Sequence, residues 1–265
     1  MPYPYCYRCP MGQTYPGCEY KCIDFIREYL RKVIPPEEVA GVITEPIQGS
    51  SGYIIPPPEY YPQLKELCDE YGWLFIADEV QTGLGRSGKM FAIEHWGVVP
   101  DIICLAKALS GGMAPLGAMI ARSDVMDWEP GVHASTFGGN LVACAAAVEA
   151  LKIIDEEKLV KRAADLGEHA LKRLQEWQER SKIIGDVRGK GLLLAIELVK
   201  DKRTKEFAVK ERDMVVREAL DRGLIVFRGG KSIIRIAPPL IMSRSELDLG
   251  LDLLEESLLE VERKC

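Results

Sequence analysis

The sequence lacks the features that mark membrane proteins, secreted proteins and nucleic-acid binders. No run reaches the roughly 18 apolar residues of a membrane-spanning helix, so no membrane partner is expected. Basic residues are not in excess: 34 Lys and Arg against 40 Asp and Glu give a net charge of −6, which argues against nucleic-acid binding. The N-terminus has no basic stretch followed by an apolar one, so we expect no secretory signal and a cytoplasmic protein.

Histidine is also scarce, which bears on metal chemistry. His95, His133 and His169 are the three histidines, and none has a second His or Cys at ligand spacing. We therefore expect them at surface or interface positions and expect no catalytic metal. In contrast, 265 residues with 47% hydrophobic content are ample for a sizeable core, in one large domain or two smaller ones.

Eight cysteines fall into two groups. Four are clustered as Cys6-x2-Cys9-x8-Cys18-x3-Cys22, and four are scattered at Cys68, Cys104, Cys144 and Cys265. The cluster is compatible with a tetrathiolate zinc site, with two disulfides or with four free thiols, and these alternatives stay open. Cys68, Cys104 and Cys144 have apolar neighbours in the sequence and are predicted to be buried thiols.

The first half of the chain alternates helices and strands. Residues 1–22 are predicted to be irregular and Cys-rich, and residues 23–155 to form an α/β domain with a parallel sheet covered on both faces. The predicted helices are 23–34, 59–71 and 140–155, the last with Asn140 as N-cap, and the predicted strands are 39–46, 73–78 and 101–107.

The second half has a different pattern, which predicts a separate α+β domain over 156–265. Residues 156–180 are charged and amphipathic, as in a helix. Strands around glycine turns are predicted in 183–200 and 224–237, and helices in 206–222 and 244–263.

Polar side chains follow each of the three predicted parallel strands. They are Glu45 and Gln48 after the first, Asp78, Glu79 and Gln81 after the second, and Lys107 and Ser110 after the third. Parallel sheets bind ligands beyond the carboxyl ends of their strands, so these residues predict one site.

Lys107 is the most informative of these residues. A lysine near desolvating walls is a nucleophile that forms Schiff bases with carbonyl compounds, including pyridoxal 5'-phosphate (PLP). That cofactor needs a carboxylate beside its pyridine nitrogen, a role that suits Asp78. Because strand side chains alternate, Val80 is predicted to face the ring, and Gln81 to contact the ring hydroxyl.

Four stretches resemble one enzyme family. They are EPIQG (45–49), IADEVQTGLGRSGKMFAIEH (76–95), PDIICLAKALSGGMAPLGAMI (100–120) and STFGGNLVACAAAVEAL (135–151). They are similar to class III, or ω-type, aminotransferases, PLP enzymes of fold type I that include the 4-aminobutyrate, ornithine and acetylornithine enzymes. The resemblance runs from about residue 36 to the end. It implies part of a large PLP-binding domain over 23–155, a small α+β domain, amino acid and 2-oxo acid substrates, and at least a homodimer.

The resemblance also implies a role for individual residues. Lys107 would hold the cofactor and move the substrate proton, with Asp78, Val80 and Gln81 around the ring. Thr136 would reach the cofactor phosphate of a neighbouring subunit. Arg235, in IIRIAPP, would bind the substrate α-carboxylate, and Glu45 would support the substrate site.

Two departures from the family pattern shape the functional expectation. Where the 4-aminobutyrate and ornithine enzymes usually carry a Glu that shields the carboxylate-binding arginine, this sequence has Ser50. That exchange favours α-amino acid chemistry, including racemisation. The chain also resembles only the C-terminal portion of the family, without the phosphate-binding loop of the N-terminal half.

The sequence therefore predicts a PLP-dependent aminotransferase, with its activity impaired if the N-terminal half is truly absent. A PLP-dependent amino acid racemase on the same scaffold is the alternative, and consumption of a 2-oxo acid would tell the two apart. An alternative of another class is a non-catalytic fragment or interaction module.

Overall fold

The computed structural model describes residues 1–264, apart from the side chain of Arg31, so Cys265 lies outside the described residues. The chain divides into two compact units. Unit one consists of Met1–Ile47, Ile55–Leu84 and Met90–Glu157, and unit two of Gln48–Ile54, Gly85–Lys89 and Lys158–Cys265. Two short segments from the first half of the chain thus fold with the second half.

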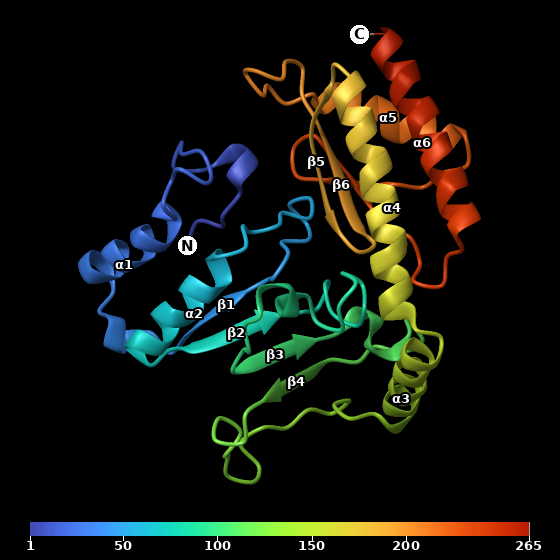
Figure 1. Cartoon of the computed structure of the whole chain (residues 1–265). Coiled ribbons are helices and arrows are strands. Elements are labelled where there is room, and N and C mark those ends of the chain that lie inside the picture. Colours follow the sequence, from blue (N-terminus) through green and yellow to red (C-terminus); the bar gives the residue numbers. More distant parts are fainter. Residues whose placement is uncertain (265) are drawn as a thin grey trace. The chain divides into compact units, whose positions relative to one another are not determined.

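Unit one contains a four-stranded sheet in the order β1-β2-β3-β4 (Figure 1). Its strands are β1 (Gly41–Thr44), β2 (Leu74–Asp78), β3 (Ile102–Leu105) and β4 (Ala118–Ala121). β1, β2 and β3 are parallel, whereas β4 pairs antiparallel with β3. The predicted parallel strands are confirmed, but β4 was not predicted because it follows a glycine turn and consists of only four residues, AMIA.

Helix α2 (Tyr60–Tyr71) covers one face of this sheet. Phe75 and Ala77 alternate with less buried neighbours along β2, and the Tyr61 ring of α2 lies 6.0 Å from the Phe75 ring. The helix ends at Gly72, whose φ of 71° is in the left-handed region that glycine adopts without strain. Because side chains alternate along a strand, the other residues of β2, including Asp78, point to the opposite face of the sheet.

Two further helices complete unit one. α1 (Lys21–Val33) buries Ile23, Ile26 and Leu30, which recur at helical spacing on one face. α3 (Leu141–Glu156) begins at Asn140, whose side-chain oxygen accepts hydrogen bonds from the backbone N–H groups of Val142 and Ala143, both at 3.1 Å. The predicted cap is therefore confirmed. Four short 3-10 turns also belong to this unit: η1 (Cys6–Arg8), η2 (Pro36–Glu38), η3 (Ala92–Trp96) and η4 (Lys107–Ser110).

Unit two is built on an antiparallel sheet in the order β5-β6-β8-β7. Its strands are β5 (Ile184–Lys190), β6 (Leu193–Leu198), β7 (Phe227–Gly229) and β8 (Ile233–Ile236), and its helices are α4 (Leu159–Arg180), α5 (Val209–Asp221) and α6 (Arg244–Lys264) (Figure 1). Every residue of β6 is buried. Aliphatic side chains from the sheet and from α4 and α6 form one continuous core, as the amphipathic pattern predicts.

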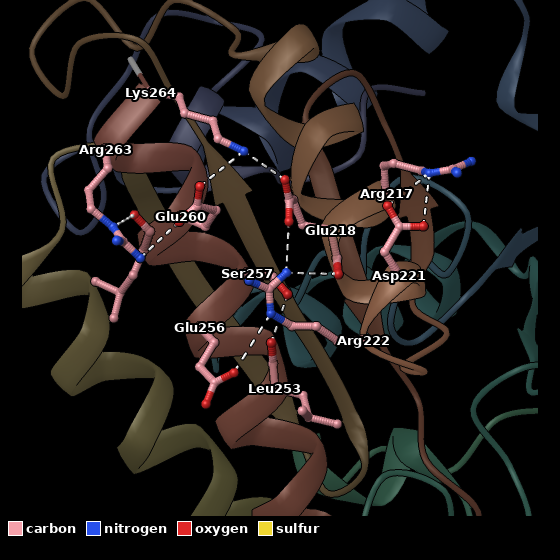
Figure 2. Close-up of polar contacts among 11 residues, drawn as sticks. Arg217, Glu218, Asp221, Arg222, Leu253, Glu256, Ser257, Glu260, Arg263 and Lys264 are labelled. Carbon is pink, nitrogen blue, oxygen red and sulfur yellow. Dashed lines mark hydrogen bonds and ion pairs between the residues drawn. The ribbon is translucent and has the colours of Figure 1, made fainter.

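Charged side chains connect α5 and α6 at the surface of unit two (Figure 2). The Lys264 ammonium lies 2.8 Å from the Glu218 carboxylate and 3.1 Å from the Glu260 carboxylate. Arg222 contacts Glu218 at 2.7 Å and Glu256 at 3.7 Å. These exposed pairs align the two helices, although each one contributes little to stability. His169 connects α4 to α6 in a similar way, 2.6 Å from Asp248 and 2.9 Å from Arg244, so its role is structural.

The buried-thiol prediction holds for only one of the scattered cysteines that can be examined. Cys68 is fully buried, whereas Cys104 and Cys144 are half-buried. Cys104 lies on β3 in register with Asp78, on a face of the sheet that α2 does not cover. Apolar sequence neighbours on both sides could not reveal which face of the strand is covered.

One contact in unit two requires a glycine. A Cβ atom on Gly167 of α4 would lie 2.1 Å from the carbonyl oxygen of Gly191, in the β5–β6 turn. Gly167→Ala should therefore lower the free energy of unfolding by roughly 2–3 kcal/mol, although alanine is the better helix former. Urea denaturation measures this loss. Gly17→Ala is the matched control, because the nearest atom to its Cβ would be 3.7 Å away. Equal stability of both variants would contradict the close packing of α4 on this turn.

Candidate active site

The carboxyl ends of β1, β2 and β3 bring three predicted site residues to one edge of the sheet in unit one. Glu45 directly follows β1, Asp78 is the last residue of β2, and Lys107 lies two residues after the end of β3. The parallel register, in which Thr44 faces Ala77 and Asp78 faces Cys104, aligns these strand ends. This is the arrangement that the sequence predicts for a ligand site in an α/β sheet.

Asp78 is a half-buried carboxylate with a fixed orientation. Its Oδ1 accepts a hydrogen bond of 3.0 Å from the backbone N–H of Val80. This bond holds the carboxylate at the strand end without neutralising its charge. The geometry suits a group that must accept a further hydrogen bond from a cationic N–H.

Glu79, the next residue, has a different role. It is 1% exposed, and its Oε1 accepts a hydrogen bond of 2.8 Å from the backbone N–H of Ile93, while the Thr82 hydroxyl donates to Oε2. Burial raises the pKa of Glu79. The carboxylate thus connects the end of β2 to the start of η3. Of these two adjacent acids, Asp78 is therefore accessible to a ligand, whereas Glu79 is buried and has a structural role.

Lys107 is exposed and has an unusual backbone conformation. Its φ of 45° lies in the left-handed region, which a lysine adopts only at a cost of order 1–3 kcal/mol. The residue starts η4, and the turn is closed when the Ser110 hydroxyl accepts a hydrogen bond of 3.2 Å from the backbone N–H of Ala114. Strain of this kind is concentrated at functional sites, which fits the predicted role of Lys107.

The residues at this edge fit the chemistry of PLP. A primary amine and a carboxylate stand at the ends of adjacent parallel strands, which is the donor set that an aldehyde cofactor with a basic ring nitrogen requires. Val80 and Gln81 follow Asp78 and are half-buried. Thr136 is exposed in the segment before α3. The individual contacts of these three residues with a cofactor stay predictions.

Glu45 contributes its main chain to the packing of unit one. Its carbonyl oxygen accepts hydrogen bonds from the Tyr61 hydroxyl at 2.6 Å and the Tyr3 hydroxyl at 2.9 Å. The N-terminal segment is thus attached to the end of β1. The predicted role of the Glu45 carboxylate in substrate binding stays a prediction.

Arg235, the predicted carboxylate-binding residue, lies on β8 in unit two. Its Nε donates to the carbonyl of Arg228 at 3.1 Å and its Nη1 to the carbonyl of Gly49 at 3.4 Å. The rings of Tyr53 and Phe227 lie 5.6 Å and 5.9 Å from the guanidinium carbon.

Among residues 1–264, no carboxylate forms an ion pair with Arg235, so neutral groups orient its guanidinium. A planar cation in this state is suited to bidentate binding of a carboxylate.

Sequence reasoning missed the groups around Arg235. Tyr53 is buried at a φ of 51°, and the positive charges of Arg235 and Arg86 oppose the effect of burial, which raises its pKa. The Arg86 guanidinium donates to the carbonyl of Pro238, and burial lowers the pKa of Arg86. Nothing in the turn SSGYIIPPP or in GLGRSG indicates that residues 48–54 and 85–89 belong to unit two.

The four clustered cysteines, Cys6, Cys9, Cys18 and Cys22, are all free thiols and line one cavity of about 30 Å³. Burial and the neighbouring thiols raise the pKa of Cys6 to about 11. Within the described part of the chain, no group of three or more His, Cys, Asp or Glu side chains is arranged to hold a metal ion. Of the three alternatives for this cluster, the geometry therefore favours free thiols.

The fold matches solved transaminase structures. An amine transaminase from an uncultivated Pseudomonas species, solved in a PLP-bound form, is 39% identical with a TM-score of 0.90, covering 97% of this chain and 60% of that one. An (S)-enantioselective omega-transaminase from Thermomicrobium roseum is 35% identical with a TM-score of 0.90, covering 98% of this chain and 59% of the other. The α/β fold of this chain is thus the fold of solved transaminases, as predicted.

The family follows from the sequence profile described as "Aminotransferase class-III", which matches residues 2–258. The chain belongs to the class III aminotransferase family. The profile begins well before residue 36, so the expected start of the resemblance was wrong. The Cys-, Tyr- and Pro-rich N-terminus carries no short catalytic motif from which its membership could be recognised.

Curated relatives include both racemases and aminotransferases. A leucine/methionine racemase of Thermococcus litoralis is 46% identical over 263 residues, covering 99% of this chain and 59% of the relative. An alanine/serine racemase of Pyrococcus horikoshii is 40% identical, covering 92% and 52%. Ornithine aminotransferase 2 of Staphylococcus aureus (strain Mu50) is 42% identical, covering 88% and 56%. The chain spans between half and three fifths of the length of these relatives.

No helix within residues 1–264 combines the length and the apolar character needed to cross a membrane.

The contrast between Asp78 and Glu79 generates a prediction. Glu79→Ala should lower the free energy of unfolding by about 2–3 kcal/mol, because it leaves the buried N–H of Ile93 without an acceptor. Asp78→Ala should change stability by less than about 1 kcal/mol, because the bond to Val80 is half-exposed. Urea denaturation of both variants measures the difference. Equal losses would contradict the division of roles.

Glu79→Gln adds a pH test, because it removes the titration while its amide oxygen still accepts from the N–H of Ile93 and its amide NH2 donates to the Thr82 hydroxyl. Since burial raises the pKa of Glu79, the folded protein binds a proton more readily than the unfolded chain. The contribution of Glu79 to stability should therefore decrease as the pH rises from the unfolded pKa through the folded one. Glu79→Gln should be less sensitive to pH than wild type over that window, and an unchanged slope would exclude Glu79 as its source.

Proposed function

We propose that the protein acts as a PLP-dependent amino acid racemase on α-amino acids with uncharged side chains. The observation that carries the proposal is the guanidinium of Arg235, which is held by neutral carbonyls and pairs with no carboxylate in the described residues. Ser50 stands where a shielding Glu is usual in the 4-aminobutyrate and ornithine enzymes, and Ser50 is exposed. Two curated relatives named as racemases support the same function.

PLP, when bound, withdraws electrons from the substrate α-carbon and thereby makes the proton on that carbon acidic. Asp78 would accept a charge-assisted hydrogen bond from the pyridine N–H of the cofactor. Lys107 would hold the cofactor through its Nζ, and the same amine would accept the α-proton of the substrate. Val80 and Gln81, which directly follow Asp78, would contact the ring.

Arg235 fixes the substrate through its α-carboxylate, a group that both enantiomers share. An arginine that pairs with no carboxylate in residues 1–264 suits a substrate that carries a carboxylate at that point in both directions of the reaction. Racemisation needs the α-proton to be removed on one face of the carbon and returned on the other. In transamination, by contrast, Lys107 would remove the proton and not return it to the α-carbon.

A homodimer is part of this proposal. Large apolar side chains are exposed in the loop before β4, in the segment before α3 and at the start of α3, with Met113 and Phe137 each 82% exposed and Leu141 85% exposed. Exposed apolar side chains of this size are typical of a protein interface. Thr136 lies in the same segment, so dimerisation would bring it to the cofactor phosphate of the neighbouring subunit.

Aminotransfer between an amino acid or ω-amine and a 2-oxo acid is the second candidate function. Family membership and the ornithine aminotransferase relatives support it. Since the chain spans little more than half of each relative, a third outcome, a fragment that folds without activity, is also tested below.

Lys107→Ala provides the test. We expect wild-type chain with PLP to convert L-leucine into D-leucine without any 2-oxo acid, and borohydride to fix the cofactor on the peptide that contains Lys107. Lys107→Ala should abolish both results. Lys161→Ala is the matched control, because that lysine lies on α4 in a surface pair with Asp165, at 2.6 Å. Chiral chromatography and peptide mapping measure the two readouts.

The outcomes separate the three candidates. Formation of a new amino acid only when a 2-oxo acid is present would establish the aminotransferase instead. Failure to fix PLP on Lys107 in a folded chain would favour the non-catalytic fragment.

A further inference from the structure

Arg188 of β5 is a nearly buried cation that contacts three separate parts of unit two. Its side chain is 10% exposed. One Nη contacts the carboxylate of Asp186 on the same strand and lies 3.2 Å from Oε2 of Glu197 on β6. Its Nε donates a hydrogen bond of 2.9 Å to the carbonyl of Gly52. Gly52 lies 136 residues away in the sequence, so Arg188 attaches a distant loop to the sheet.

That loop, Gln48–Ile54, is a compact turn. Gln48 and Ile54 form two backbone hydrogen bonds of 3.1 Å, and the N–H of Gly52 donates to the carbonyl of Gly49 at 3.0 Å. Gly52 has a φ of 105°, and a Cβ atom there would lie 2.6 Å from Cδ1 of Ile233. The turn is therefore in close contact with β8, and only glycine fits at the point of contact.

The same loop contacts Arg235, the proposed carboxylate-binding residue on β8. The carbonyl of Gly49 accepts a hydrogen bond from Nη1 of Arg235, and the Tyr53 ring faces its guanidinium. On its other side, the Arg235 side chain lies against Gly229, where a Cβ atom would be 2.9 Å from its Cγ. The N–H of Gly230 also donates to the carbonyl of Ser50 at 3.3 Å. The position of Arg235 thus depends on the position of the loop.

We propose that Arg188 is a positioning residue for the substrate carboxylate site, acting through the Gly52 carbonyl and the 48–54 loop on Arg235. This inference rests on the proposed function, in which Arg235 binds the α-carboxylate. Asp186 and Glu197 both contact Nη1 of Arg188, while its Nε donates to the Gly52 carbonyl of the loop. A lysine could keep the charge at this position but could not contact the two acids and the loop through separate nitrogens.

The test compares Arg188→Lys with wild type and with Arg173→Lys. Arg173 is a suitable control because its ion pairs, to Asp248 and Asp252, connect α4 and α6 and do not involve the loop. Two quantities are measured on the full chain: hydrogen exchange of the backbone amides in 48–54, and the dissociation constant for L-leucine by calorimetry in the presence of PLP.

We expect Arg188→Lys to speed exchange in 48–54 and to raise the L-leucine dissociation constant by roughly 10-fold, as for the loss of one charge-assisted hydrogen bond. Borohydride fixation of PLP on Lys107 should be unchanged, because that residue belongs to unit one. Arg173→Lys should leave all three readouts at wild-type values. Should Arg188→Lys fail to fold, Glu197→Gln replaces it, since it removes one of the two charges that orient Arg188.

The inference and the function beneath it fail in different ways. If Arg235→Gln binds L-leucine as well as wild type does, the carboxylate role of Arg235 is wrong whatever Arg188 does. If Arg235→Gln loses binding while Arg188→Lys and Glu197→Gln show neither faster loop exchange nor weaker binding, the positioning role of Arg188 is overturned. Faster hydrogen exchange in 48–54 with an unchanged dissociation constant for L-leucine would also overturn it, because the loop would then not determine the position of Arg235.

Discussion

The parallel pairing of β1, β2 and β3 is the constraint on which the chemistry of unit one depends. Because the three strands run in the same direction and in a continuous register, their last residues meet at one edge of the sheet. Glu45, Asp78 and Lys107, which are 62 residues apart in the chain from first to last, are brought together only by this pairing. Parallel sheets of this kind place their ligands beyond the strand ends.

Local geometry then decides which polar residue at that edge is chemically available. Side chains alternate along a strand, so Asp78 and Glu79 diverge although they are neighbours. Glu79 accepts hydrogen bonds from the N–H of Ile93 and the hydroxyl of Thr82. Asp78 is half-buried and accepts one hydrogen bond from the backbone. The left-handed backbone at Lys107 adds a local strain that the surrounding turn maintains.

Much of this could be predicted from the sequence, because strand, helix and cap signals are local. The cap at Asn140, the parallel strands of unit one and the strand-end residues all followed from short-range patterns, whereas the expected cover on both faces of the sheet did not, since Ile43 of β1 is 62% exposed. The antiparallel β4, the assignment of 48–54 and 85–89 to unit two, and the aromatic rings around Arg235 could not be predicted, since they depend on contacts between residues far apart in the chain. Arg188 belongs to the same class, because only the fold brings it to Gly52.

Family membership leaves the reaction open, because racemases and aminotransferases occur among the relatives at similar identity. The central claim is that Arg235 and Lys107 serve α-proton exchange on a carboxylate-anchored amino acid. The most direct measurement is incubation of L-leucine with the chain and PLP in deuterated water, without a 2-oxo acid, followed by mass analysis of the separated enantiomers. The account predicts α-deuterated D-leucine that accumulates until the two enantiomers are equal. Deuterium confined to L-leucine, with no D-leucine formed, would contradict it.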